Sequence, residues 1–324
     1  MSLATICLPV QADLKAVEDV LIQHTGSSVG LVTEAAKYVL QNGGKRIRPA
    51  LLLLTSKLLG YPVTKAADLG AAVEMIHAAS LMHDDVLDDA EIRRGKPASN
   101  VKWGNQISIL VGDFLWCRAS EIAISYGNDR ILSSITAAVK NTTEGEILEI
   151  VRSSDFDINE EDYLRIIELK TAMLFACSCQ LGAILAGASK NFEETMKTYG
   201  LNIGIAFQLA DDVLDYVSND VNLGKKTGTD LCEGKLTLPI ILALKKCSEG
   251  EGKILKDALL ANTLDAAKLK EIRAILENLG TLQESMNLAK KYVKIAKDAL
   301  MPFKPSLERD ALAAIADYAV SRDK

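Results

Sequence analysis

The sequence is poor in proline and has no excess of positive charge. Its 324 residues contain seven prolines, and none lies between Pro97 and Pro239. Proline breaks helix interiors, so this interval has room for long helices. The net charge of −6 argues against a general nucleic-acid or anionic-membrane surface, because such surfaces need clustered Lys and Arg. We expect no nucleic-acid partner, and any bound anion must be met by a local group of cations.

Zinc-binding and membrane-spanning patterns are also missing. There are three histidines and six dispersed cysteines without a Cys-x-x-Cys pair, which predicts reduced, mostly buried thiols in a cytoplasmic protein. The densest apolar segments, Ala50–Leu54 and Leu238–Leu244, fall far short of the ~20 residues that span a bilayer. Residues Met1–Leu14 do not resemble a signal peptide. We expect a soluble protein without an integral membrane segment.

Helices dominate what is present. Apolar residues recur at three- and four-residue steps, as in the run Ile131–Val139, and strand-like alternation is scarce. Asn42–Gly44 is expected to close one helix and Gly95–Pro97 another, while Asn222–Gly234 is expected to be a polar loop. The pattern predicts an all-α fold, with one large helical-bundle domain over residues 1–324.

The strongest chemical signal is a run of aspartates near the end of a helix expected from about Ala66 to Glu91. Asp84 and Asp88 stand one turn apart, and Asp85 and Asp89 are expected to do the same on an adjoining face. A helix C-terminus carries partial negative charge, which disfavours each carboxylate there by roughly 0.3–1 kcal/mol. A cation must therefore compensate for this cluster.

The same spacing returns at Asp211, Asp212 and Asp215, again late in an apolar helix. Oxygen ligands without His or Cys suit a hard cation, and Mg²⁺ commonly shares its shell with substrate phosphates. Two carboxylate walls facing one cavity could hold a diphosphate through bridging Mg²⁺. The alternative is two solvated acidic faces, which the flanking Leu, Val and Ala residues make the weaker interpretation.

Cations flank both aspartate segments. The turn Gly43–Pro49 places Lys45, Arg46 and Arg48 at a helix N-terminus, where backbone N–H groups already favour anions. Taken singly, each basic cluster fits a solvated helix end, His77 fits a core histidine, and Gln208 fits a surface amide. The other cations near the segments are Arg93, Arg94, Lys225, Lys226 and Lys235.

Six ordered blocks make the chain resemble the trans-isoprenyl (polyprenyl) diphosphate synthases over nearly its whole length. The blocks are Gly43-Gly44-Lys45-Arg46-x-Arg48-Pro49, His83-Asp84-Asp85-x-x-Asp88-Asp89 with Arg93-Arg94-Gly95, Gly112-Asp113-Phe114-Leu115, Lys170-Thr171, Phe207-Gln208-Leu209-x-Asp211-Asp212-x-x-Asp215, and Gly224-Lys225 through Gly234-Lys235-x-Thr237-Leu238-Pro239. None of these motifs is broken. The resemblance implies the isoprenoid-synthase fold, with the active site in a central cavity between helices.

The resemblance also implies a role for each matching residue. Asp84, Asp88 and Asp211 would hold Mg²⁺, about three ions with Mn²⁺ as a substitute, and Asp85, Asp212 and Asp215 would support the metal shell. Lys170, Lys225, Lys235 and Arg93 would contact the allylic diphosphate, beside Thr171 and Gln208. Lys45, Arg48, His77 and Arg94 would bind isopentenyl diphosphate. The residues expected to carry catalysis are Asp84, Asp88, Lys170, Asp211 and Lys225, and a homodimer is expected from the family.

Small residues precede the first aspartate segment. Ala79 and Ser80 lie one turn back from Asp84, about 6–7 Å along the axis. In the family, bulky aromatic residues at this place close the product tunnel of short-chain enzymes. Small residues predict a long product, roughly C30–C50 as in quinone side chains, which the protein would hand to a membrane. The alternative is that Ala79 and Ser80 merely allow close helix packing.

Three other functions remain open from the sequence. One is a synthase of farnesyl or geranylgeranyl length. Another is a non-catalytic partner subunit of a heteromeric synthase, although such subunits usually lose one aspartate segment. A terpene cyclase fits less well, because it would ordinarily lack the glycine–lysine–arginine block. The amphipathic segment 248–287 carries no assignable chemistry.

Overall fold

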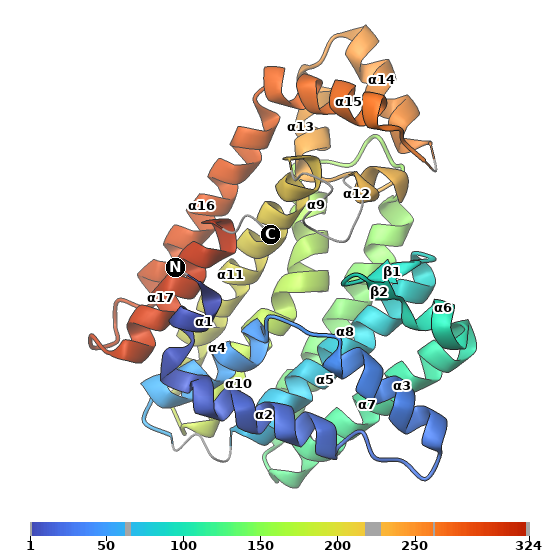
Figure 1. Ribbon diagram of the computed structural model, residues 1–324. Helices are drawn as coiled ribbons and strands as arrows, with labels where there is room; N and C mark the ends of the chain where they lie inside the picture. The colour runs from blue at the N-terminus through green and yellow to red at the C-terminus, as the bar shows by residue number, and fades with distance from the viewer. Residues whose placement is uncertain (1, 62–65, 218–227, 262, 322–324) are drawn as a thin grey trace.

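The computed structural model describes residues 2–61, 66–217, 228–261 and 263–321, and these residues are almost entirely helical (Figure 1). The only strands among them form a two-stranded antiparallel hairpin, so the prediction of an all-α fold is confirmed. The elements are α1 (Leu3–Ile6), η1 (Leu8–Val10), α2 (Gln11–Gln23), α3 (Gly30–Gln41), α4 (Ile47–Leu58), α5 (Ala67–Leu87), β1 (Ile92–Arg93), β2 (Lys96–Pro97), α6 (Ser99–Trp103), α7 (Asn105–Ser125), α8 (Asp129–Arg152), α9 (Glu160–Ile167), η3 (Glu168–Ala172), α10 (Met173–Leu185), α11 (Lys190–Val217), α12 (Thr229–Cys232), α13 (Leu238–Lys246), α14 (Glu249–Leu259), α15 (Ala266–Asn278), α16 (Thr281–Ala299) and α17 (Leu307–Ser321).

Long apolar helices pack side by side around the centre of the molecule. Helix α5 packs mainly against α7, α10 lies against both α4 and α11, and α11 packs along α16. Helix α4 is buried on nearly every side, since Ala50, Leu51, Leu52, Leu53 and Leu54 have no exposed surface. A helix that is apolar all round belongs in a core. This arrangement places α5, α8, α10 and α11 around a common interior.

The first aspartate helix is shorter than predicted. It ends at Leu87 instead of near Glu91, with Asp88 as its C-cap and Asp89 in the left-handed region at φ 47°. The N–H of Ala90 donates to the Asp85 carbonyl at 2.9 Å, which is the closing bond of a Schellman motif. Asp89 therefore does not lie one turn from Asp85 on a helix face. The predicted pairing of these two residues is wrong, whereas Asp84 keeps its place in the last turn.

Two predicted chain breaks also differ from the structure. Gly95 does not close a helix but stands at φ 73° in the turn of the β1–β2 hairpin, where glycine carries little strain. Part of the loop predicted over Asn222–Gly234 is the short helix α12, and residues 218–227 lie outside the described residues. By contrast, α3 ends at Gln41 with Asn42 as its C-cap, as predicted.

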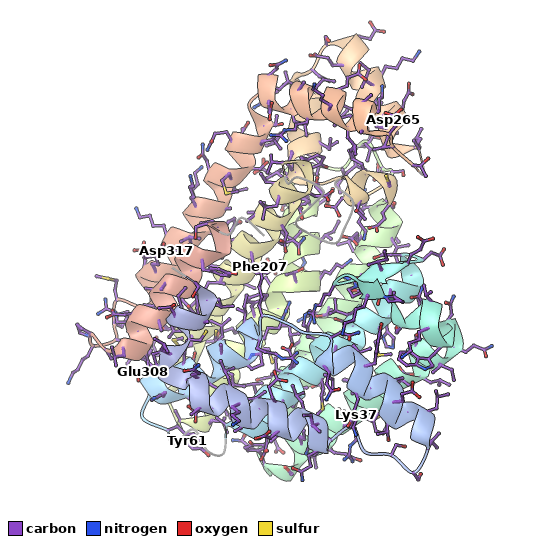
Figure 2. The ribbon with its side chains drawn as sticks, viewed as in Figure 1. Lys37, Tyr61, Phe207, Asp265, Glu308 and Asp317 are labelled. Atoms are coloured by element: carbon purple, nitrogen blue, oxygen red, sulfur yellow. The ribbon has the colours of Figure 1, made fainter. Side chains whose placement is uncertain are left out.

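The segment 248–287 has a packing role. It forms α14, α15 and the start of α16 at the end of the molecule marked by Asp265 in Figure 2. Leu255, Leu259, Ile272 and Leu276 are buried in a second apolar cluster that includes residues of α11 and α13. Its amphipathic pattern is therefore explained by one buried face.

Within the described residues, one helical stretch, Glu160–Leu185, is long and apolar enough to cross a membrane by length and composition. Most of its apolar window, 78%, is buried inside the protein, as in a core helix of a soluble protein. All six cysteines are free thiols, and Cys7, Cys177 and Cys179 are buried, which confirms the prediction of unpaired cysteines.

Candidate active site

A cavity of about 610 Å³ opens between the helices, and both aspartate segments contribute to its wall. Asp84 reaches it from α5 and Asp211 from α11. Phe175 and Phe207 also line the cavity, with ring centroids 5.4 Å apart. Phe207 lies near the middle of the bundle (Figure 2). The cavity therefore combines facing carboxylates with an apolar aromatic surface.

The aspartates of α5 have three different surroundings. Asp84 faces the cavity, and burial raises its pKa to about 7, with further contributions from Glu146 and Asp88. Asp88 accepts a hydrogen bond from Lys235 Nζ at 3.2 Å. Asp85 turns to the other side of the helix. Asp84 and Asp88 line the groove of about 530 Å³ that adjoins the cavity, whereas Asp85 does not.

Asp85 is held by an arginine. It is 4% exposed, accepts a hydrogen bond from Arg93 Nε at 2.6 Å, and forms an ion pair with Arg93 Nη2 at 2.5 Å. Arg93 also lines both the cavity and the groove. Asp85 thus contributes to the site indirectly, by holding the Arg93 side chain that lines it.

The aspartates of α11 divide in the same way. Asp211 faces the cavity, whereas Asp212 is buried beneath it. Asp212 accepts hydrogen bonds from the Tyr163 hydroxyl at 2.5 Å and Gln208 Nε2 at 2.7 Å. Burial raises the pKa of Asp212, and these two donors oppose the rise. Asp215 Oδ2 accepts from the backbone N–H of Asp230 at 3.2 Å.

A π-helical turn carries Lys170 and Thr171. Insertions of this kind inside α-helices often mark functional sites, because they redirect side chains. Gly145 of α8 and Gly204 of α11 make room for the turn from two neighbouring helices. A β-carbon at Gly145 would lie 2.4 Å from Lys170 N, and one at Gly204 would lie 2.4 Å from the Cα of Ala172. Because a side chain at either position would clash with the turn, the two glycines let the π-helical turn pack closely against α8 and α11.

Lys170 projects between two glutamates of α8. Its Nζ lies 2.8 Å from Glu146 and 2.5 Å from Glu149. Burial opposes its charge, but the two carboxylates outweigh burial and raise the pKa of Lys170. The neighbouring Thr171 hydroxyl donates to Gln208 Oε1 at 2.8 Å, so the π-helical turn is tied to α11. Lys170 lines both the cavity and the groove.

Lys235 crosses the groove to the first aspartate wall. Its Nζ lies 3.2 Å from Asp88, 2.7 Å from Glu233 and 3.8 Å from Glu149. Burial disfavours its charge, yet these three carboxylates raise the pKa of Lys235. Lys225, predicted to act beside it, lies outside the described residues.

The donors fit a hard divalent cation. Asp84, Asp88 and Asp211 present carboxylate oxygens to one connected space, and the raised pKa of Asp84 shows that its charge lacks sufficient cationic compensation. Among the described residues, no three acidic, His or Cys side chains form a cluster that could enclose a metal ion. A metal ion held by these carboxylates would need further oxygen ligands, which Mg²⁺ commonly takes from water and phosphate.

The predicted cations line the part of the same cavity beside Arg48. Arg48 lies over the Phe175 ring at 4.4 Å from its centroid, and its buried Nε has no hydrogen-bond partner among the described residues. Lys45 Nζ is 5.6 Å from the centroid of Tyr318. Burial and the neighbouring arginines hold the pKa of His77 well below its usual value, so it is neutral at pH 7. Lys45, Arg48, His77 and Arg94 all line this part of the cavity.

Ala79 and Ser80 face different surroundings. Ser80 lines the cavity one turn before Asp84, and its hydroxyl donates to the His77 carbonyl at 2.9 Å. Ala79 is 4% exposed and packs in the core. Of the two residues predicted to set product length, only Ser80 is among those that line the cavity.

Several acidic residues of the site escaped the sequence analysis. Glu146 and Glu149 are three positions apart and share a face of α8, directly after Gly145. That combination was the available signal. Glu74, Tyr163 and Asp230 carried no recognisable pattern, because each becomes informative only through a partner distant in sequence.

A helical bundle around a cavity with facing carboxylates and converging cations defines the isoprenoid-synthase class of enzymes. The family model described as "Polyprenyl synthetase" matches residues 29–276, and the chain belongs to this family. It is therefore a prenyltransferase, a prenyl diphosphate synthase.

Relatives of known name agree with this assignment. The chain is 36% identical over 312 residues to the octaprenyl diphosphate synthase of Escherichia coli, covering 96% of each protein. It is 39% identical over 293 residues to a short chain isoprenyl diphosphate synthase of Methanothermobacter thermautotrophicus, covering 89% of this chain and 90% of the relative. A polyprenyl synthase from Caulobacter crescentus, solved with calcium and isoprenyl diphosphate, superposes with a TM-score of 0.95 at 37% identity, covering 100% of this chain and 98% of that one.

Proposed function

We propose that the protein is a Mg²⁺-dependent synthase that condenses isopentenyl diphosphate with an allylic diphosphate, head to tail and repeatedly. The observation that carries the proposal is that Asp84 and Asp211 line one cavity together with Arg48 and His77. Two diphosphates need two anion-binding regions, and this cavity offers a carboxylate–metal region and a cationic region. The solved relative that contains calcium and isoprenyl diphosphate supports a divalent ion in this role.

In the proposed site, Asp84, Asp88 and Asp211 hold the metal ions, while the other aspartates of each segment support them. About three Mg²⁺ ions supply positive charge to the allylic diphosphate when bound, and Mn²⁺ serves as a substitute. Lys170, Lys235 and Arg93 contact the same diphosphate, with Lys225 as a further ligand. Thr171 and Gln208 line this region. Lys45, Arg48, His77 and Arg94 bind isopentenyl diphosphate.

The chemistry follows from the placement of these charges. Lys170 and Lys235 stabilise the negative charge that develops on the leaving diphosphate as the allylic C–O bond breaks. The double bond of isopentenyl diphosphate attacks the resulting carbocation, and a C–C bond forms. A proton then leaves the adjacent carbon for the released diphosphate. Phe175 and Phe207 exclude water from the cation, and the new allylic diphosphate can enter another cycle.

The proposed product is long, roughly C30–C50, because the residue that lines the cavity one turn before Asp84 is the small Ser80. A quinone side chain of this length would be handed to a membrane. The alternative, a product of farnesyl or geranylgeranyl length, is favoured by the similarity to the short chain relative. A non-catalytic subunit is less well supported, because both aspartate segments are intact.

The proposal includes one domain over residues 1–324, in a soluble cytoplasmic homodimer. Apolar side chains stay exposed along α7 and α8, which favours a protein–protein interface. They include Leu110 at 62%, Ile124 at 61% and Val151 at 69% exposure. A symmetric pairing of two copies would cover this face.

A product assay with the purified chain alone tests the proposal. The chain is incubated with Mg²⁺, labelled isopentenyl diphosphate and each allylic primer, and the products are separated by chromatography and weighed by mass spectrometry. We expect five-carbon increments that end between about C30 and C50 and that disappear with EDTA. A C15 or C20 end product would favour the short-chain alternative. No incorporation by the chain alone would refute the proposal.

A further inference from the structure

Glu74 is a buried carboxylate among the cations of the cavity. Its side chain is 4% exposed, and it lies on α5 about three turns before Asp84. Its Oε1 accepts a hydrogen bond from Arg46 Nη1 at 2.7 Å, and it lines the same cavity as Arg48. A buried negative charge so close to an anion-binding region weakens anion binding unless it has another use. Its position therefore calls for a specific role.

Arg46 is the first part of that role. It caps α4 with φ 49°, a left-handed conformation that a non-glycine residue rarely adopts. Such a conformation persists where the surroundings hold it. Besides Glu74, the guanidinium bonds to Glu18 Oε1 at 2.5 Å and to the Leu40 carbonyl at 2.6 Å. These bonds fix the turn that carries Lys45 and Arg48 on either side of Arg46.

The second part is the meeting of three charged groups at Gly44. A β-carbon at Gly44 would lie 3.0 Å from Arg46 Nη1, 3.2 Å from Arg94 Nη1 and 3.4 Å from Glu74 Oε1. The two guanidinium groups therefore converge beside the same carboxylate. Like charges at such separations repel, and a carboxylate between them offsets the repulsion.

The third part is the balance of charge around Arg48. Burial, with a smaller contribution from Arg94, lowers the pKa of Arg48 to about 10, and Glu74 is the largest influence that opposes this fall. Glu74 acts on the pKa of Arg94 in the same direction. The Glu74 carboxylate thus hydrogen-bonds to Arg46 and favours the charged forms of Arg48 and Arg94.

We propose that Glu74 is a positioning residue for the isopentenyl diphosphate subsite: it orders Arg46, Arg48 and Arg94 so that the cationic part of the cavity is preformed for the incoming diphosphate. This inference rests on the proposed function. Glu74 does not touch the reacting atoms, so it acts through substrate binding and not through the chemical step. The loss of order in the arginines outweighs the gain in net positive charge when Glu74 is neutralised.

The experiment compares Glu74→Gln, Glu74→Asp and a matched control, Glu18→Gln, in steady-state assays with each substrate varied. Glu18 also bonds Arg46, but its side chain is 42% exposed and it is not among the residues that line the cavity. We expect Glu74→Gln to raise KM for isopentenyl diphosphate about tenfold and to leave KM for the allylic primer within about twofold. Glu74→Asp, which keeps the charge, should recover part of the affinity. Glu18→Gln should lower the Tm with little change in either KM.

Calorimetric titration of each folded variant with isopentenyl diphosphate provides a readout independent of turnover. The same tenfold loss of affinity in Glu74→Gln is expected. Unchanged or tighter binding would overturn the inference, since it would mean that Glu74 acts only as an opposing charge. An equal effect of Glu18→Gln would overturn it too, because anchoring of Arg46 alone would then be sufficient. A wild-type chain that incorporates no isopentenyl diphosphate would instead refute the proposed function.

Discussion

Asp84 is expected to lower the stability of the metal-free protein while it serves the site. Its pKa is raised to about 7 from an ordinary value of 3.8 by burial, Glu146 and Asp88. A raised carboxyl pKa contributes stability that is present below pH ~4 and is lost as the pH rises through 7. At pH 8 the ionised group therefore costs free energy. Asp84→Asn should remove this cost.

The magnitude follows from the pKa difference. The full difference would correspond to roughly 4 kcal/mol, and partial solvent exposure and coupling to Glu146 reduce it to about 1–2 kcal/mol. For a chain of 324 residues that is a Tm increase of about 1.5–3 °C at pH 8 in EDTA. At pH 5 the carboxyl is protonated in the folded protein but still mostly ionised in the unfolded chain, so the Tm difference should fall to less than half of its value at pH 8. Scanning calorimetry at both pH values, at one scan rate, measures the effect.

Asp88→Asn is the matched control. Asp88 bonds Lys235, so its neutralisation should not raise the Tm. Mg²⁺ with inorganic pyrophosphate should raise the Tm of the wild type and leave that of Asp84→Asn nearly unchanged. A lower Tm for Asp84→Asn at pH 8 without metal would refute the reasoning, because it would show that Asp84 is already compensated.

Three further predictions concern product length and packing. Ser80→Phe should shorten the product on chromatography, because Ser80 lines the cavity one turn before Asp84; an unchanged product length would contradict the open-tunnel hypothesis. Gly204→Ala should lower both kcat and Tm, because its methyl group would meet the Ala172 backbone, whereas Gly250→Ala, with open space around it, should raise the Tm slightly. Tyr163→Phe should lower the free energy of unfolding by about 1–3 kcal/mol in denaturant melts, because Asp212 loses a buried hydrogen bond; an unchanged midpoint would contradict that contact.

The helices were predictable from the sequence because apolar spacing and glycine punctuation are local signals. The end of α5 was not, since the left-handed turn at Asp89, directly after the C-cap Asp88, depends on one backbone hydrogen bond between Ala90 and Asp85. The π-helical turn at Lys170 was also beyond the sequence, because it depends on the close approach of Gly145 and Gly204. Its position follows from packing between helices.

The aspartate segments and their cations were predictable because their spacing repeats. The sequence did not indicate which aspartate of each segment faces the cavity. Asp85 and Asp212 share the motif with their neighbours, yet each hydrogen-bonds to a donor from another element, Arg93 or Tyr163. The acidic partners of the cations, such as Glu74, were missed because contacts between distant residues leave no local pattern.

The central claim is that the two aspartate segments hold one diphosphate through shared divalent ions. A crystal structure of the protein with Mg²⁺ and an unreactive allylic thiolodiphosphate tests it most directly. We predict metal ions bound to Asp84 and Asp88 on one side and to Asp211 on the other, with the diphosphate between them and Lys170 and Lys235 turned from their glutamates toward it. Metal ions on one segment alone, with the diphosphate outside the cavity, would contradict the account.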